Sequence, residues 1–187
     1  MEEICQLDER GDARIEINFQ LGAKKWAQWK YQYGNQPDIV LRNLKYQLAA
    51  AVLDDAGFQM EKDEVHRRAV ARVTARALAS YRREGQFEID VPKNMKLVAN
   101  SGREWVFTNS ALEEDGIINI TNRFKLPAHA HNPRLATGND YDHLIYSLKI
   151  PRSKPKLLYA GLLLLVTAAV LGTLSFRPSR AIAALPP

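Results

Sequence analysis

Cysteine is almost absent from this chain, which has one, Cys5, among 187 residues. A disulfide framework is therefore excluded, and the composition fits a reducing compartment. The first residues, MEEICQLDERGD, contain no basic segment and no apolar run, so a secretory signal peptide is not expected there. The acidic and polar character of this stretch predicts instead a flexible terminus over residues 1–13.

A large excess of one charge sign is also absent. The net charge is +5, from 26 basic and 21 acidic residues. Two of the basic residues, Arg177 and Arg180, lie in the last 31 residues, which hold no acid. The preceding part of the chain therefore has 24 basic and 21 acidic residues, or +3. This small excess permits an anionic partner but does not require one.

The short motifs of common enzyme classes are also missing. The sequence contains no GxGxxG, no GxxxxGK[ST] and no GxSxG. Cys5 has no histidine near it in the sequence, and Asn100-Ser101-Gly102 is typical of a turn rather than of a nucleophile elbow. No motif indicates a known family, and neither catalytic residues nor a cofactor are expected.

One long apolar run is present, LLYAGLLLLVTAAVLGTLSF, which begins at Leu157 and ends at Phe176. Twenty uncharged residues form a helix of roughly 30 Å, the thickness of a hydrocarbon core. A buried helix of this kind would have to be apolar on every face, and a domain of this size has little room for one. We therefore predict a transmembrane helix over 157–176, with Tyr159 and Phe176 near its two interfaces.

The flanks of this run predict its orientation. Basic residues precede it at Lys149, Arg152, Lys154 and Lys156, and two arginines follow it. Because cytoplasmic flanks carry the excess of lysine and arginine, we expect a cytoplasmic domain before the helix. Residues 151–156 then form a basic tether and residues 177–187 a short tail on the far side. This is the layout of a single-pass, tail-anchored membrane protein.

Small residues share one face of the predicted transmembrane helix. They are Gly161, Ala168, Gly172 and Ser175. Such a face lets two helices approach closely and would favour self-association in the membrane. The alternative is that glycine, alanine and serine occur there only because they are common in such helices.

Residues 14–150 indicate one α+β domain with a mostly antiparallel sheet and two helices. Apolar residues at helical spacing predict one helix from Pro37-Asp38 to about Asp54 and a second over 62–83. Alternation of apolar and polar residues predicts strands. These are expected at 14–20, 87–91, 103–109, 117–126 and 143–150.

Basic and aromatic residues are the candidate contacts with anionic lipid or a protein partner. They are Trp26, Trp29, Arg68, Arg72, Arg76, Arg83, Lys149, Arg152, Lys154 and Lys156. The four arginines would form a stripe on the helix expected at 62–83, and such a stripe could bind phosphates. A solvated face is the favoured interpretation, because acids open this helix and arginines close it, as its dipole prefers.

The two tryptophans belong to the stretch KKWAQWKYQYG. Three interpretations of it are open: a packed aromatic face with lysines in water, contact with lipid headgroups, and stacking on nucleic-acid bases. We rank them in that order, because base stacking normally accompanies a domain more basic than +3.

Histidines and acids form one possible metal site, His129, His131, Asp142 and His143. Imidazoles with a carboxylate could bind zinc or iron. Against this, the first two histidines lie between Pro127 and Pro133 in an expected loop, and no HExxH helix or cysteine pair accompanies them. The ordinary alternative is a polar turn before a strand.

These observations favour a non-enzymatic binding or assembly module at a membrane surface. Its expected partners are the lipid bilayer and another protein or a second copy of the chain. A membrane-associated metal-dependent enzyme is the alternative, and a nucleic-acid-binding module is ranked last.

Overall fold

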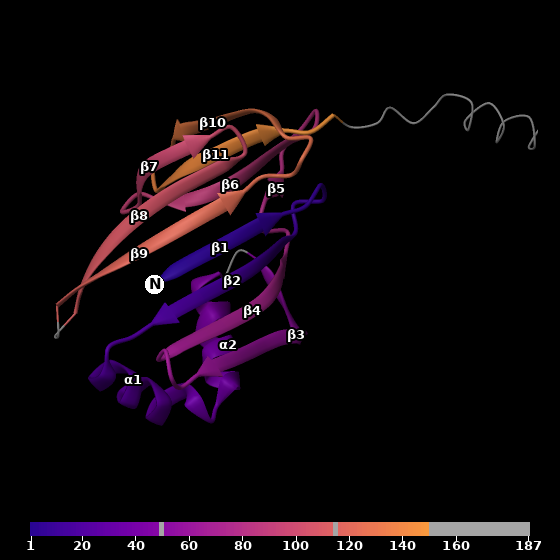
Figure 1. The fold of residues 1–187 in the computed structure, drawn as a ribbon. Helices are drawn as coiled ribbons and strands as arrows, with labels where there is room; N and C mark the ends of the chain where they lie inside the picture. Colours follow the sequence, from indigo (N-terminus) through magenta and orange to yellow (C-terminus); the bar gives the residue numbers. More distant parts are fainter. Residues whose placement is uncertain (49–50, 114–115, 150–187) are drawn as a thin grey trace, which may run out of the picture. The chain divides into compact units, whose positions relative to one another are not determined.

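A computed structural model of the chain describes residues 1–48, 51–113 and 116–149. Met1–Lys149 form one compact unit. Two sheets and two α-helices make up its regular structure (Figure 1). The prediction of an α+β domain with two helices and a mostly antiparallel sheet is confirmed.

The larger sheet has seven strands in the order β3-β4-β2-β1-β9-β8-β7. Their bounds are β1 Glu2–Leu7, β2 Ala13–Gln20, β3 Val52–Asp63, β4 Arg68–Arg76, β7 Lys96–Ser101, β8 Glu104–Glu113 and β9 Gly116–Lys125. Neighbouring strands are antiparallel except β1 and β9, which pair in parallel. The first strand of the chain therefore lies in the middle of the sheet.

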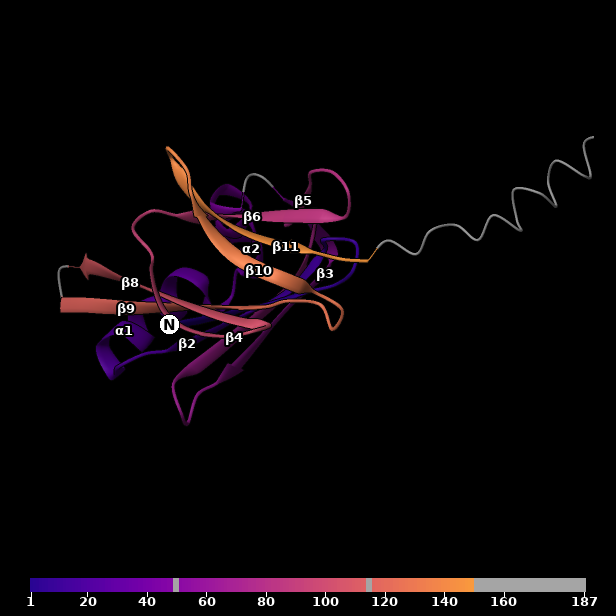
Figure 2. The same ribbon diagram turned by 90° about the horizontal axis from the view of Figure 1, so that it is seen from above.

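The smaller sheet has four antiparallel strands in the order β10-β11-β6-β5. Their bounds are β5 Ser80–Tyr81, β6 Gln86–Pro92, β10 His131–Thr137 and β11 Tyr141–Ser147. The helices are α1 Ala23–Trp29, which continues as a π-helical turn, η1 Lys30–Gly34, and α2 Pro37–Gln47. Figure 2 shows the smaller sheet as a second layer over the larger one.

One face of the seven-stranded sheet packs against α2 and the four-stranded sheet. Alternate side chains of β2 and β4, such as Ile15, Ile17 and Val73, are buried there together with Leu41 of α2 and Leu144 of β11. The side chains between them point to the opposite side of the sheet, because successive residues of a strand alternate. We call this opposite side the outer face.

The prediction of a helix over 62–83 is wrong, because these residues form the last part of β3 and the whole of β4 and β5. The reason lies in the spacing: apolar residues four apart, such as Ala69, Val73 and Ala77, suit one helix face, but four is also an even number and suits one strand face. Pairing with β2 and β3 on both sides makes residues 68–76 a strand. The second helix is α1, within the aromatic stretch.

The flexible terminus predicted over residues 1–13 is also wrong, because β1 pairs with both β2 and β9. Cys5 is only 2% exposed and Leu7 is 4% exposed. The alternation of β1 escapes notice in the sequence because the acid Glu3 occupies an inward position, two residues before Cys5, and the apolar Ile4 occupies an outward one. Its partner in β9 lies more than a hundred residues away.

The other predicted elements are found near their expected places. Strands at 14–20, 87–91, 103–109, 117–126 and 143–150 correspond to β2, β6, β8, β9 and β11. The first helix begins at Pro37 as predicted but ends at Gln47, and Asp54 belongs to β3.

Within the described ranges, no helix has the length and apolar character needed to cross a bilayer. The predicted span over 157–176 lies outside those ranges, as do the tether over 151–156 and the tail over 177–187. So do all the anchor residues: Leu157, Tyr159, Gly161, Ala168, Gly172, Ser175 and Phe176.

Candidate binding face of the seven-stranded sheet

The outer face of the seven-stranded sheet carries polar and charged side chains in rows that cross the strands. In one row, Arg14 of β2 lies opposite Thr74 of β4 on one side and opposite Gln6 of β1 on the other. Gln6 in turn lies opposite Lys125 of β9. Two cations, one amide and one hydroxyl, each from a different strand, are thus neighbours although they are far apart in the sequence.

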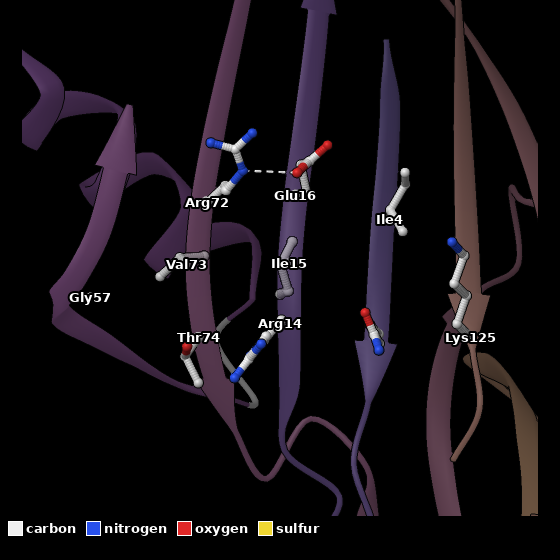
Figure 3. A pocket seen from close by; sticks show the side chains of 10 residues that line it. Ile4, Arg14, Ile15, Glu16, Gly57, Arg72, Val73, Thr74 and Lys125 are labelled. Atoms are coloured by element: carbon white, nitrogen blue, oxygen red, sulfur yellow. Dashed lines mark hydrogen bonds and ion pairs between the residues drawn. The ribbon is translucent and has the colours of Figure 1, made fainter. Parts of the chain in front are cut away.

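A depression of about 360 Å³ lies over this row and the next one (Figure 3). Its polar lining consists of Gln6, Arg14, Glu16, Arg72, Thr74 and Lys125. Three cations and one carboxylate among them give the lining a net charge of +2. The depression is therefore suited to a small anionic group.

Arg72 is neutralised by carboxylates. Its Nε donates to Oε2 of Glu16 at 2.8 Å, and its Nη1 lies 2.7 Å from Oε1 of Glu61. Glu16 accepts a second hydrogen bond, from Nδ2 of Asn18 at 3.1 Å. These bonds, that from Arg72 above all, lower the pKa of Glu16. This ion-pair cluster forms one wall of the depression. Because the charge of Arg72 is compensated within the cluster, it contributes little to the attraction of an anionic ligand.

Arg14 and Lys125 differ from Arg72, because neither has an ion-pair or hydrogen-bond partner for its side chain within the described part of the chain. Both side chains are exposed. Only β1 separates their strands, so their Cα atoms are roughly 10 Å apart, two strand spacings. In Figure 3, Arg14 extends toward Thr74 and Lys125 lies on the other side of Ile4. The two cations line one depression from opposite sides.

Three of the four arginines predicted to form a stripe do share a face, but on a strand and not on a helix. Arg68, Arg72 and Arg76 occupy alternate outward positions of β4, because a spacing of four preserves the parity of a strand. Arg68 donates to Oδ1 of Asn18 at 2.6 Å. Arg83 lies apart from them, in the turn between β5 and β6. Their contact with a ligand stays a prediction, as does that of Lys149, while Arg152, Lys154 and Lys156 lie outside the described residues.

Trp26 and Trp29 are buried, with 5% and 8% of their surfaces exposed. Their rings stack with centroids 5.2 Å apart, and Trp29 also contacts Phe19 and Tyr33. The indole Nε1 of Trp26 donates to Oε2 of Glu64 at 3.2 Å. This arrangement corresponds to the packing interpretation, since neither ring presents a face to lipid or to bases.

The histidines and acids of the predicted metal site are not brought together. Nε2 of His129 lies 3.8 Å from a carboxylate oxygen of Glu9, and Nδ1 of His131 contacts the carbonyl oxygen of His129 at 2.9 Å. Asp142 and His143 are successive residues of β11 and point to opposite faces. His143 instead contacts Glu88 and Asp90 of β6.

Two ionisable groups lie on the inner side of β1. Sγ of Cys5 is 3.5 Å from Oε1 of Glu3. Burial raises the pKa of the Glu3 carboxyl and also that of the Cys5 thiol. Because only the thiolate is a good nucleophile, the raised pKa disfavours covalent catalysis by Cys5.

The raised pKa of Glu3 predicts a pH-dependent gain in stability for Glu3→Gln. The folded protein binds the Glu3 proton more tightly than the unfolded chain, so this group favours folding below its unfolded pKa and opposes it as the pH rises through the folded pKa. Glutamine cannot ionise. Urea unfolding should show the variant more stable than the wild type at pH 7, with the difference shrinking as the pH falls toward 4. A difference independent of pH would contradict the assignment.

No family model, curated protein sequence or solved structure matches this chain.

Proposed function

We propose that this chain is a membrane-tethered, non-enzymatic binding module. Residues 1–149 form the binding domain, on the cytoplasmic side, and the apolar run over 157–176 anchors it. The outer face of the seven-stranded sheet binds a phosphate group, and a lipid headgroup or a phosphorylated partner is the source of that phosphate.

One observation carries the proposal: Arg14 and Lys125 line a single depression with no carboxylate partner in the described residues. Two other arginines of this face, Arg72 and Arg123, are paired with carboxylates. Arg123, for example, contacts both Glu2 and Glu104. A phosphate over Gln6 could accept hydrogen bonds from both free cations, while Thr74 and Gln6 offer further donors. Hydrogen bonds with charged partners are the stronger ones.

The length of the tether favours lipid as the source of the phosphate. Seven residues, 150–156, separate the described domain from the predicted anchor, and a fully extended chain of that length spans about 25 Å. β11, the last described strand, runs toward the same end of the domain as β1 and β9 (Figure 1). Gln6 and Lys125 lie near that end of their strands. The acidic inner leaflet of a membrane also attracts lysine and arginine.

Removal of residues 157–187 tests the division into domain and anchor. The full-length chain should sediment with membranes and require detergent for release. The truncated chain should be soluble, with a circular dichroism spectrum rich in strand and a cooperative unfolding transition. A truncated chain that stays in the membrane fraction, or that is unfolded, would show that the division is wrong.

A further inference from the structure

We propose a divalent metal site on the four-stranded sheet, formed by Glu88 and Asp90 of β6 and His143 of β11. Nδ1 of His143 lies 2.9 Å from Oε1 of Glu88 and 2.9 Å from Oδ1 of Asp90. The three ligand atoms lie within 4.8 Å of one another. This site is on a different sheet from the depression between Arg14 and Lys125, and it does not depend on that proposal.

The strand register creates the cluster. His143 lies directly opposite Asp90 in the β6–β11 pair, and Ile145, two residues along, lies opposite Glu88. Glu88 and Asp90 are also two residues apart, so all three ligands project from the face of the sheet that points away from the core. Glu88 is nevertheless buried, with 8% of its side chain exposed. Buried carboxylates are normally paired or bound to a metal.

The spacing of the ligand atoms suits a first-row transition metal. Two cis ligands at 2.1 Å in an octahedral site are about 3.0 Å apart, close to the distances from Nδ1 to the two oxygens. The contact of Nδ1 with Oδ1 of Asp90 is a hydrogen bond, while that with Oε1 of Glu88 is an ion-pair contact, whereas a cation can bind all three atoms. One imidazole with two carboxylates suits Zn²⁺, Mn²⁺ or Fe²⁺, with water in the remaining positions.

Gly138, in the turn between β10 and β11, holds the imidazole in this orientation. A Cβ added to Gly138 would come within 2.4 Å of Nε2 of His143 and within 2.3 Å of the carbonyl oxygen of Tyr141. The turn therefore packs against the Nε2 edge of the ring, and Nδ1 faces the carboxylates. Gly138 is a positioning residue for the metal ligand.

Arg82 occupies part of the same site. Its Nη2 lies 2.5 Å from Oε1 of Glu88, the oxygen that also faces His143. Its charge would repel a bound cation, and Oε1 cannot serve both partners fully. Arg82 is therefore a competitor of the metal. Its removal should strengthen metal binding, whereas a network of structural ion pairs would only be weakened.

Titration of Zn²⁺ alone into the full-length protein in detergent, after removal of metal with a chelator, tests this proposal. Calorimetry should show one Zn²⁺ per chain. His143→Gln and Asp90→Asn should each weaken binding at least about tenfold, the loss typical of an impaired metal site. Arg82→Gln should strengthen it. The matched control is His129→Gln with His131→Gln, which removes two imidazoles outside this cluster and should leave the affinity unchanged.

Co²⁺ in place of Zn²⁺ gives a second readout, because visible absorption reports the ligands around the ion. The wild type should develop a visible band that His143→Gln lacks. The proposal is overturned if the wild type binds no Zn²⁺ stoichiometrically, if His143→Gln binds as tightly as the wild type, or if the loss of binding follows the control histidines. Unfolding curves of all variants show whether each is folded.

Discussion

Replacing Arg14 and Lys125 together by glutamine is expected to weaken the binding of a phosphate group about thirtyfold. Each exposed cation contributes about 1 kcal/mol to such a contact, the upper end for surface ion pairs. Two contributions give about 2 kcal/mol, and a factor of ten corresponds to about 1.4 kcal/mol. The remaining affinity should depend less on salt than that of the wild type, because two charges fewer are screened.

The measurement is calorimetric titration of the full-length protein in non-ionic detergent with two probes, inorganic phosphate and dihexanoyl phosphatidic acid. Binding of both with similar affinity would show that the phosphate group alone is recognised, and tighter binding of the second probe would indicate a lipid source. A matched control, Lys93→Gln with Arg134→Gln, removes one lysine and one arginine that are exposed elsewhere. Equal loss in the control, or no binding by the wild type, would refute the proposed face.

Trp29→Ala is expected to have the largest effect on stability, a loss of about 3–5 kcal/mol. The ring is buried against Trp26, Phe19 and Tyr33, and truncation would leave a cavity among them. Urea unfolding measures the loss. The control is Tyr31→Ala in the same stretch, where the side chain is 91% exposed and the change should be within about 0.5 kcal/mol.

Tryptophan emission distinguishes packing from membrane contact at the same residues. Packed rings should emit at the same wavelength whether the detergent is exchanged for neutral or for acidic lipid. Two results together would contradict the packing: no loss of stability in Trp29→Ala, and an emission wavelength that changes with the lipid. The aromatic stretch would then contact the membrane.

The parts of the fold that follow from local pattern were predictable. Ile15 and Ile17 alternate with polar neighbours and predict β2, and Pro37 with leucines at helical spacing predicts α2. Residues 68–76 were not predictable in the same way, because arginines and apolar residues four apart satisfy both a helix face and a strand face. Which one forms is decided by pairing with β2 and β3, which no local pattern reveals.

The candidate sites depend on such long-range pairing. Arg68, Arg72 and Arg76 share a face in a helix and in a strand alike. That part of the prediction therefore holds although the helix was wrong. The neighbourhood of Arg14 and Lys125 exists only because β1 inserts between β2 and β9. Likewise, Glu88 and Asp90 alternate visibly in QFEIDVP, but their contact with His143 follows from the register of β6 with β11. The sequence gives the residue types, but the strand register determines which of them are in contact.

Lysine acylation of the full-length protein in lipid nanodiscs tests the proposed phosphate-binding face most directly, since mass spectrometry reads each lysine separately. Discs that contain phosphatidic acid are compared with discs of phosphatidylcholine alone, with and without added inorganic phosphate. We predict that either form of phosphate slows acylation of Lys125 several-fold while Lys93 reacts at an unchanged rate. Equal labelling of Lys125 with and without phosphate, or equal slowing of Lys93, would contradict a phosphate-binding face on the seven-stranded sheet.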